Sequence, residues 1–279
     1  MTEIYVDSWL QLQEVLYEDS YREDIGRFRS PFIFHGLPDK DYRLATSLMR
    51  LGGDYAKLER TILYNFRRYA GNRAVFHDSE WNWLSVAQHH GLPSRLLDWT
   101  DSPYVALHFC TEDLDQYDKD GCIWCVNFRL AHKLLPDNLK EKLRDYNLSL
   151  FTVEILDEEI GKITNLNSIT DPDNPRLLFF EPPALDDRII NQYSIFSVLT
   201  DPSMAIDDWL YSHDEDKLWK KIIIPACLKW ETRDKLDKAN ITERVLFPGL
   251  DGLCSWLKRR YWPKVGCEPK YLNQKSNEM

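Results

Sequence analysis

The chain has 279 residues, and its 45 acidic and 35 basic side chains give a net charge of −10, which argues against nucleic acid as the primary partner and against a membrane surface. Hydrophobic residues make up 43% of the chain, enough for a sizeable core, but no segment approaches the roughly 18 consecutive apolar residues that span a bilayer. Six cysteines without a visible secretory signal predict reduced thiols, so we expect a soluble protein of the cytoplasm.

The N-terminal part of the chain is predicted to hold two helices with a strand between them. Apolar residues at helical spacing predict the helices over residues 8–18 and 54–70. Residues 32–36 (FIFHG) are a short apolar run stopped by a glycine, which is typical of a strand. The strand therefore places a histidine near its end, beside a turn.

Residues 79–110 hold the densest run of polar groups set among core-forming residues. A helix is predicted over residues 79–89, ending at a Gly-x-Pro turn, and a short buried strand over 95–99. Residues 102–103 (SP) are a typical helix start, because Ser caps free backbone N–H groups and Pro fits the first turn. Polar groups at the ends of buried elements predict a ligand site, although a well-satisfied turn has the same pattern.

The rest of the chain mixes short strands and helices without a regular βαβ order, which predicts an α+β fold in a single domain. The expected elements are strands at 122–128, 177–180, 194–199 and 221–226, a helical turn at 186–192, and helices at 228–239, 242–246 and 250–260. We divide the chain into a helical lead-in (1–27), a main domain (28–255) and a C-terminal tail (256–279).

Four charged or titratable residues of the dense block are candidates for ligand contacts. Arg95 and Asp98 lie three apart on a strand, hence on opposite faces, and each needs its own partner because a lone buried charge is costly. Arg95 could grip a phosphate through a bidentate contact, and Asp98 could orient a histidine. His89 and His90 end a helix, where a positive charge also stabilises the helix dipole, so at most one of them is expected to face a site.

Cys122 and Cys125, with His132 downstream, have a spacing that superficially resembles a zinc site. On a strand, however, residues three apart point to opposite faces, and Ile and Trp between the thiols do not make a turn. We therefore expect core cysteines and no metal.

Three sequence blocks carry a family resemblance: AQHHGLPSRLLDWTDSPYVALHF (87–109), DRIINQYSIFSV (187–198) and ITERVLFPGLDGL (241–253). Together they resemble the FRG domain, a family named for a Phe-Arg-Gly motif, over roughly residues 28–255. The chain departs from the family pattern at His35, which stands where the name-giving Arg is expected, and at Ser194, which replaces a usual Gly.

The order of the motifs is also similar to that of ADP-ribosyltransferases, which bind NAD with three separated elements. These are a strand ending in Arg or His, a strand with Ser or Thr leading into a helix, and a third element with a polar catalytic residue. The corresponding segments here are 34–36, 98–109 and Gln192. The resemblance implies a small split, mostly antiparallel sheet of short strands surrounded by helices, with NAD as a substrate.

The resemblance also implies roles for residues of the first two segments. His35 would hydrogen-bond the ribose of NAD, although a histidine satisfied by a backbone carbonyl is an equal alternative. Gly36 would let the nicotinamide amide approach the backbone closely. Thr100 would line the pocket, although its hydroxyl could simply cap the next helix.

The third segment lacks the acidic residue that is common in those enzymes. Gln192 lies four residues after Arg188, so the two share a helical face, and Gln192 could orient a ribose or a water. Because an amide does not titrate usefully, Glu181 is the nearby acid to test as a replacement.

Two functions remain open at this point. The first is an NAD-cleaving or ADP-ribosyl-transferring enzyme, and the second is a non-catalytic module that senses a nucleotide or a protein segment; either could belong to a bacterial toxin or phage-defence system. The predicted catalytic residues are His35, Gln192 and Glu181, and the predicted ligand-binding residues are Gly36, His90, Arg95, Asp98, Thr100 and Arg188.

Overall fold

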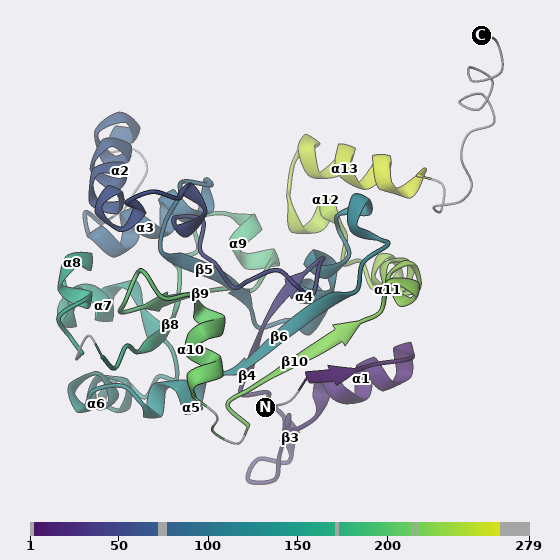
Figure 1. Cartoon of the computed structure of the whole chain (residues 1–279), viewed down its shortest axis with the longest axis horizontal. Coiled ribbons are helices and arrows are strands. Elements are labelled where there is room, and N and C mark those ends of the chain that lie inside the picture. Colours follow the sequence, from purple (N-terminus) through teal and green to yellow (C-terminus); the bar gives the residue numbers. More distant parts are fainter. Residues whose placement is uncertain (1–2, 72–76, 171–172, 214, 216, 263–279) are drawn as a thin grey trace.

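A computed structural model of the chain describes residues 3–71, 77–170, 173–213, 215 and 217–262. Eight strands form one sheet in the order β1-β10-β6-β4-β5-β9-β8-β7 (Figure 1). Their bounds are β1 (Glu3–Tyr5), β4 (Phe32–Leu37), β5 (Leu96–Thr100), β6 (Gly121–Asn127), β7 (Phe151–Thr152), β8 (Leu177–Glu181), β9 (Ser194–Leu199) and β10 (Trp219–Ile224). A separate hairpin is formed by β2 (Tyr21–Arg22) and β3 (Arg27–Phe28).

The sheet is mostly antiparallel, with parallel pairs only at its two edges, β1 with β10 and β7 with β8, among the described residues. The predicted α+β class is thus confirmed. The prediction of a small sheet is wrong, because all six expected strands join one sheet and two short edge strands extend it. Segments of three and two residues, such as β1 and β7, are too short to carry a periodic pattern.

The sheet is nearly divided between β4 and β5. These two strands share a single pair of opposed residues, Phe34 and Thr100, whereas β4 pairs with β6 at all of its positions from Phe32 to Leu37. Beyond Phe34 and Thr100, the backbone N–H and C=O groups of β4 and β5 therefore do not form ladder hydrogen bonds with each other. This separation of two central strands makes room for side chains between the halves of the sheet.

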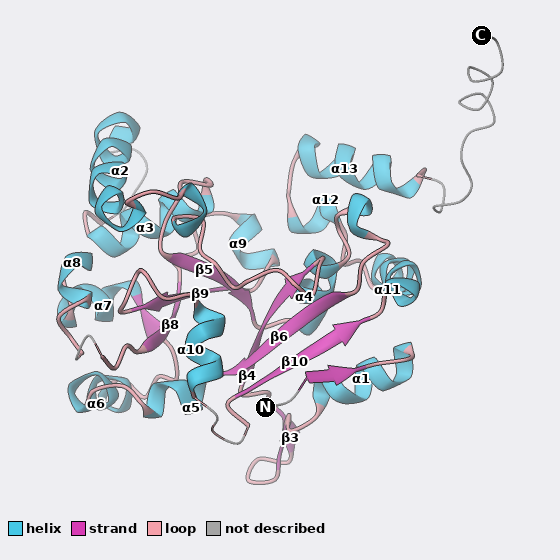
Figure 2. Cartoon of the chain, in the orientation of Figure 1, coloured by secondary structure: helices cyan, strands magenta, loops and turns pink. Residues whose placement is uncertain are grey.

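Helices surround both faces of the sheet, as Figure 2 shows. Apolar residues of α5 and α10 pack on one face across both halves. On the other face, α1, α4 and α11 cover the half that contains β4, while α3 and α7 cover the half that contains β8 and β9. The helices are α1 (Trp9–Tyr17), α2 (Tyr55–Ala70), α3 (Glu80–His89), α4 (Pro103–Cys110), α5 (Phe128–Lys133), α6 (Asp137–Asp145), α7 (Val153–Glu159), α8 (Ile163–Leu166), α9 (Asp187–Asn191), α10 (Ile206–Ser212), α11 (Ala226–Lys238), α12 (Glu243–Leu246) and α13 (Leu250–Arg260).

The helices of the dense block begin where their caps predict. The Ser79 hydroxyl accepts a hydrogen bond from the backbone N–H of Asn82 and starts α3, and Ser102 does the same for Val105 and starts α4. Pro103 occupies the first turn of α4. Local chemistry thus fixes the ends of both helices that flank β5.

Candidate functional site

A cavity of about 310 Å³ lies where β4 and β5 separate. Both strands line it, together with residues from α3, from the end of α4 and from the segment around α9. Six of the predicted site residues are among its walls: His35, Gly36, Asp98, Thr100, Arg188 and Gln192. Segments that are more than 150 residues apart in the chain therefore meet at one hollow; their chemical roles stay predictions.

His35 is held by the backbone of the opposite strand. Its Nδ1 lies 2.6 Å from the carbonyl oxygen of Asp98. A carbonyl only accepts, so we assign the proton to Nδ1, which leaves the Nε2 lone pair free to accept a hydrogen bond. Burial lowers the pKa of His35 to about 4, so the ring is neutral at pH 7. One ring nitrogen, Nδ1, is thus satisfied by a backbone carbonyl, as the alternative interpretation expected. The other, Nε2, remains available to a ligand.

Asp98 ends a fixed chain of hydrogen bonds. Its Oδ2 accepts from Gln88 Nε2 at 2.7 Å, and Gln88 Oε1 accepts from the Ser94 hydroxyl at 2.7 Å. The Ser94 hydroxyl accepts from the backbone N–H of Leu96, so its proton is directed to Gln88 and the Gln88 amide has one orientation.

The Asp98 carboxyl is exposed to the cavity, but protein surrounds the cavity. This burial raises the pKa of Asp98 against the opposing influence of Gln88 and Arg188. A carboxyl group with a raised pKa in a cavity is a candidate for proton transfer.

Arg188 brings an incompletely bonded guanidinium group to the cavity. It lies 4.9 Å from the centre of the Phe247 ring, and its Nη1 makes a long contact of 3.5 Å with the backbone oxygen of His89. Its Nε is buried and has no hydrogen-bond partner among the described residues. An unsatisfied buried donor is costly, and a water or a ligand acceptor reaches this N–H only after the side chain or its neighbours shift.

His90 lines a neighbouring hollow of about 450 Å³ rather than the cavity itself. The two spaces share Ser47, Gln88, Asp98 and Arg188 as walls. His89 lines the same hollow, and its Nε2 lies 2.8 Å from Asp186, which caps α9. Neither histidine is a wall of the cavity itself, and the hollow is a second compartment next to it.

Thr100 and Gln192 line the cavity, but their polar groups also hold the fold. The Thr100 hydroxyl donates to the backbone oxygen of Gln192 at 2.6 Å and accepts from the N–H of Ser102 at 3.0 Å. The Gln192 amide donates to the backbone oxygen of Leu246 at 2.9 Å. The Thr100 hydroxyl therefore helps to start the next helix, which was the alternative to a pocket role. Gln192 connects β5 to α12 through its backbone oxygen and its side-chain amide.

Close packing against α4 requires a glycine at position 36. A Cβ at this position would lie 1.9 Å from the backbone oxygen of Ala106 in α4. Because residues alternate on a strand, Gly36 faces α4 and His35 faces the other side. Gly36 also lines the cavity, and the expected approach of a nicotinamide amide to its backbone stays a prediction.

Arg95 is not in the cavity. Its side chain is 5% exposed and forms an ion pair with the equally buried Glu59 of α2, with Nε–O distances of 2.8 and 2.7 Å. A further hydrogen bond of 2.8 Å joins its Nη1 to Asn167. The prediction that Arg95 needs a partner other than Asp98 is confirmed, but its position as a phosphate ligand in this cavity is wrong.

Glu181 is also outside the cavity. It is the exposed last residue of β8 and lies opposite Thr152 of β7. In the sheet β8 is separated from β5 by β9, and two strand spacings amount to about 10 Å. The proposal that Glu181 supplies the missing acid is therefore not compatible with this cavity.

Glu112 is the acid that sequence reasoning missed. It follows α4, is exposed, and lines the cavity. Its Oε2 lies 3.4 Å from Nε2 of the fully buried His108, whose Nδ1 accepts from Arg233 at 2.8 Å. This contact places the His108 proton on Nε2, toward Glu112. The four-residue spacing of His108 and Glu112 at a helix end is the sequence signal that could have found the pair. Arg50, exposed at the cavity wall, had no such signal.

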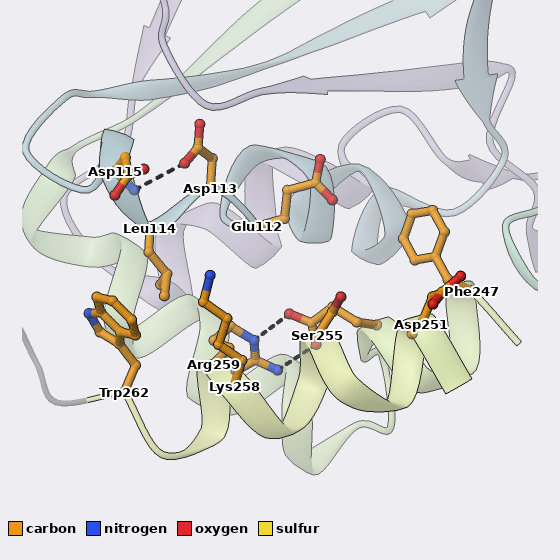
Figure 3. A pocket seen from close by; sticks show the side chains of 12 residues that line it. Glu112, Asp113, Leu114, Asp115, Phe247, Asp251, Ser255, Lys258, Arg259 and Trp262 are labelled. Carbon is orange, nitrogen blue, oxygen red and sulfur yellow. Dashed lines mark hydrogen bonds and ion pairs between the residues drawn. The ribbon is translucent and has the colours of Figure 1, made fainter. Parts of the chain in front are cut away.

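Glu112 also borders a separate hollow of about 450 Å³ between the segment after α4 and helix α13 (Figure 3). Asp113 and Asp115 lie on one side of it, and Asp251 and Lys258 lie along α13 on the other. The single carboxylate of Glu112 thus forms a wall common to both spaces.

Cys122 and Cys125 are both fully buried, in core clusters on opposite faces of the sheet. Burial raises the pKa of Cys125 to about 12, so it is an unreactive thiol. Within the described residues, no group of three or more His, Cys, Asp and Glu side chains is arranged to hold a metal ion. None of the described helices combines the length and the apolar character needed to cross a membrane.

The fold and cavity define an α+β protein with a ligand-sized hollow at the separation of two central strands. Comparison with known families identifies residues 30–119 as an FRG domain, so the resemblance seen in the sequence is confirmed over those residues. The match includes β4, β5 and Glu112, and ends before Arg188 and Gln192. No curated protein and no solved structure matches the chain.

Proposed function

We propose that the cavity between β4 and β5 binds NAD or a closely related nucleotide, and that the protein cleaves the bond between nicotinamide and ribose. The observation that carries this proposal is the convergence of His35, Asp98 and Arg188 on one cavity from three distant segments. The cavity and the compartment next to it, about 310 and 450 Å³, are each in the size range of small-molecule sites. Two neighbouring spaces with common wall residues suit a ligand with two halves.

The polar groups of the cavity suit the parts of such a ligand. The free Nε2 of His35 accepts a hydrogen bond from a ribose hydroxyl. The guanidinium groups of Arg188 and Arg50 attract phosphate oxygens, and His90 extends this polar lining into the second compartment. The ligand is therefore expected to place its sugar near β4 and its phosphates toward α3.

The reaction requires negative charge next to the sugar. When the bond between C1′ and the nicotinamide nitrogen breaks, the electron pair leaves with nicotinamide and positive charge develops on the ribose. The Asp98 and Glu112 carboxylates stabilise that charge. Water then forms the new bond to C1′ and gives its proton to Asp98, whose raised pKa makes it a stronger base than an ordinary carboxylate.

The test compares melting temperature and nicotinamide release with and without NAD. We expect NAD to raise the melting temperature and nicotinamide to appear at a steady rate. Asp98→Asn keeps the acceptor for Gln88 but cannot take a proton, so its turnover falls by about 100-fold or more while NAD still raises the melting temperature. Glu181→Gln, outside the cavity, is the matched control and turns over like the wild type.

The outcomes separate two functions. A melting-temperature shift without nicotinamide release would favour the non-catalytic module, a reading supported by the use of the Thr100 and Gln192 side chains in the fold. If NAD neither raises the melting temperature nor releases nicotinamide, NAD is rejected as the ligand.

A further inference from the structure

Helix α13 carries an apolar stripe that the rest of the described chain covers only in part. Leu250, Leu253, Leu257 and Tyr261 are 78%, 37%, 37% and 79% exposed. Their spacing of three, four and four residues places them on one side of the helix. Figure 1 shows α13 at the periphery of the molecule, next to α12.

The opposite side of α13 is firmly packed, so the orientation of the stripe is fixed. Arg259 is 5% exposed and forms ion pairs with Glu243 and Asp237. A Cβ on Gly252 would lie 1.9 Å from the backbone oxygen of Phe247, which shows how closely this side meets the preceding chain. The helix cannot rotate to hide its leucines without breaking these contacts.

Two opposite charges on one flank of the stripe can pair with the same two charges of a second copy. Asp251 and Lys258 lie seven residues apart on the same flank of α13, at opposite ends of the stripe. No ion pair joins either of them to another described residue; Lys258 lies over the Trp262 ring at 5.7 Å. If a second α13 lies antiparallel against the first, a two-fold axis near Ser255 brings each Asp251 close to the Lys258 of the other copy.

We propose that α13 is an isologous interface with a second copy of this chain, formed by antiparallel packing of the stripe. We choose a second copy as the occupant because one two-fold axis satisfies both features. It places the apolar residues of the two stripes against each other, and it places Asp251 of each copy beside Lys258 of the other. Cys254, exposed on the edge of the stripe and one residue from that axis, lies near the Cys254 of the other copy. The flank with Asp251 and Lys258 borders the hollow of Figure 3, so the partner helix runs beside it.

The first test measures the mass of the intact chain by light scattering over a range of concentrations. We expect a species of twice 33.1 kDa that dissociates on dilution. Leu253→Glu/Leu257→Glu places four carboxylates in the paired interface and yields the monomer, with an unchanged circular dichroism spectrum. The matched control is Leu10→Glu/Leu58→Glu, two exposed leucines of α1 and α2, which leaves the dimer intact.

The second test uses a short bis-maleimide on the intact chain with Cys227 replaced by Ser. We expect a covalent dimer that Cys254→Ser abolishes and Cys267→Ser does not. A monomer at all concentrations would overturn the proposal. So would a link within one chain between Cys254 and Cys267, which would make the C-terminal segment the occupant. Neither test involves NAD, so the outcome is independent of the proposed function.

Discussion

His35 links the backbone of the separated strands to the chemistry of the cavity. Its Nδ1–H satisfies the Asp98 carbonyl, a group that a continuous sheet would have paired with β4. The cost is a half-buried, poorly solvated ring that resists protonation, and its pKa falls to about 4. A neutral histidine with a fixed proton is what a hydrogen-bond acceptor for a ribose hydroxyl requires.

This lowered pKa predicts a loss of stability in acid. The unfolded chain takes up a proton at His35 near pH 6.5 and the folded chain only near pH 4. The free energy of unfolding therefore falls as the pH drops from about 6.5 to about 4, by up to about 3 kcal/mol from this residue. Urea unfolding of His35→Gln, which keeps an N–H donor but does not titrate, should show a shallower decline than the wild type. His132, buried outside the cavity with the same lowered pKa, is the matched comparison; equal slopes for wild type and His35→Gln would contradict the assignment.

At the scale of elements, β4 serves two purposes by alternation. His35 turns to the cavity, and Gly36 turns to α4 and lets that helix approach the strand. One residue of this His-Gly pair thus lines the cavity with its side chain, and the next is required by packing. The position of α4 in turn places Glu112 at the cavity wall.

Gly36→Ala is expected to destabilise the fold strongly. Its methyl group would lie 1.9 Å from a backbone oxygen, which cannot move without shifting α4. We expect a loss of about 3 kcal/mol or more in urea unfolding. The control is Gly53→Ala, where no atom lies within 4 Å and only the positive φ of 61° costs about 1 kcal/mol. A similar loss for both variants would show that close packing is not the reason for Gly36.

At the scale of the whole molecule, buried ion pairs connect helices and loops that are not linked through the sheet. Glu59 and Arg95 connect α2 to the start of β5, and Arg95 also reaches Asn167 behind α8. Arg259 does the same for α11, α12 and α13. Such pairs gain little over apolar packing, but removing one partner leaves a buried charge.

Glu59→Ala should therefore cost about 3–5 kcal/mol in the free energy of unfolding, because Arg95 remains buried and unpaired. Lys57→Ala on the same helix, which removes the exposed pair with Asp54, should cost less than about 1 kcal/mol. Neither residue touches the cavity. Both variants, assayed at a temperature where they are folded, should therefore release nicotinamide from NAD at the wild-type rate. If Glu59→Ala alone lost nicotinamide release while still folded, a role of Arg95 in the ligand site would be supported after all.

The sequence by itself determined the FRG motif within residues 30–119, the α+β class, the six longer strands and the caps of α3 and α4, because all of these follow from local patterns. It also determined that Arg95 and Asp98 would not pair, because alternation along a strand is local geometry. Only the tertiary structure decided that the sheet has eight strands, that it parts between β4 and β5, and that Asp98 and Glu112, rather than Glu181, are the acids beside His35. The reason is that strand order and separation depend on which distant segments pack together, and a cavity exists only between them.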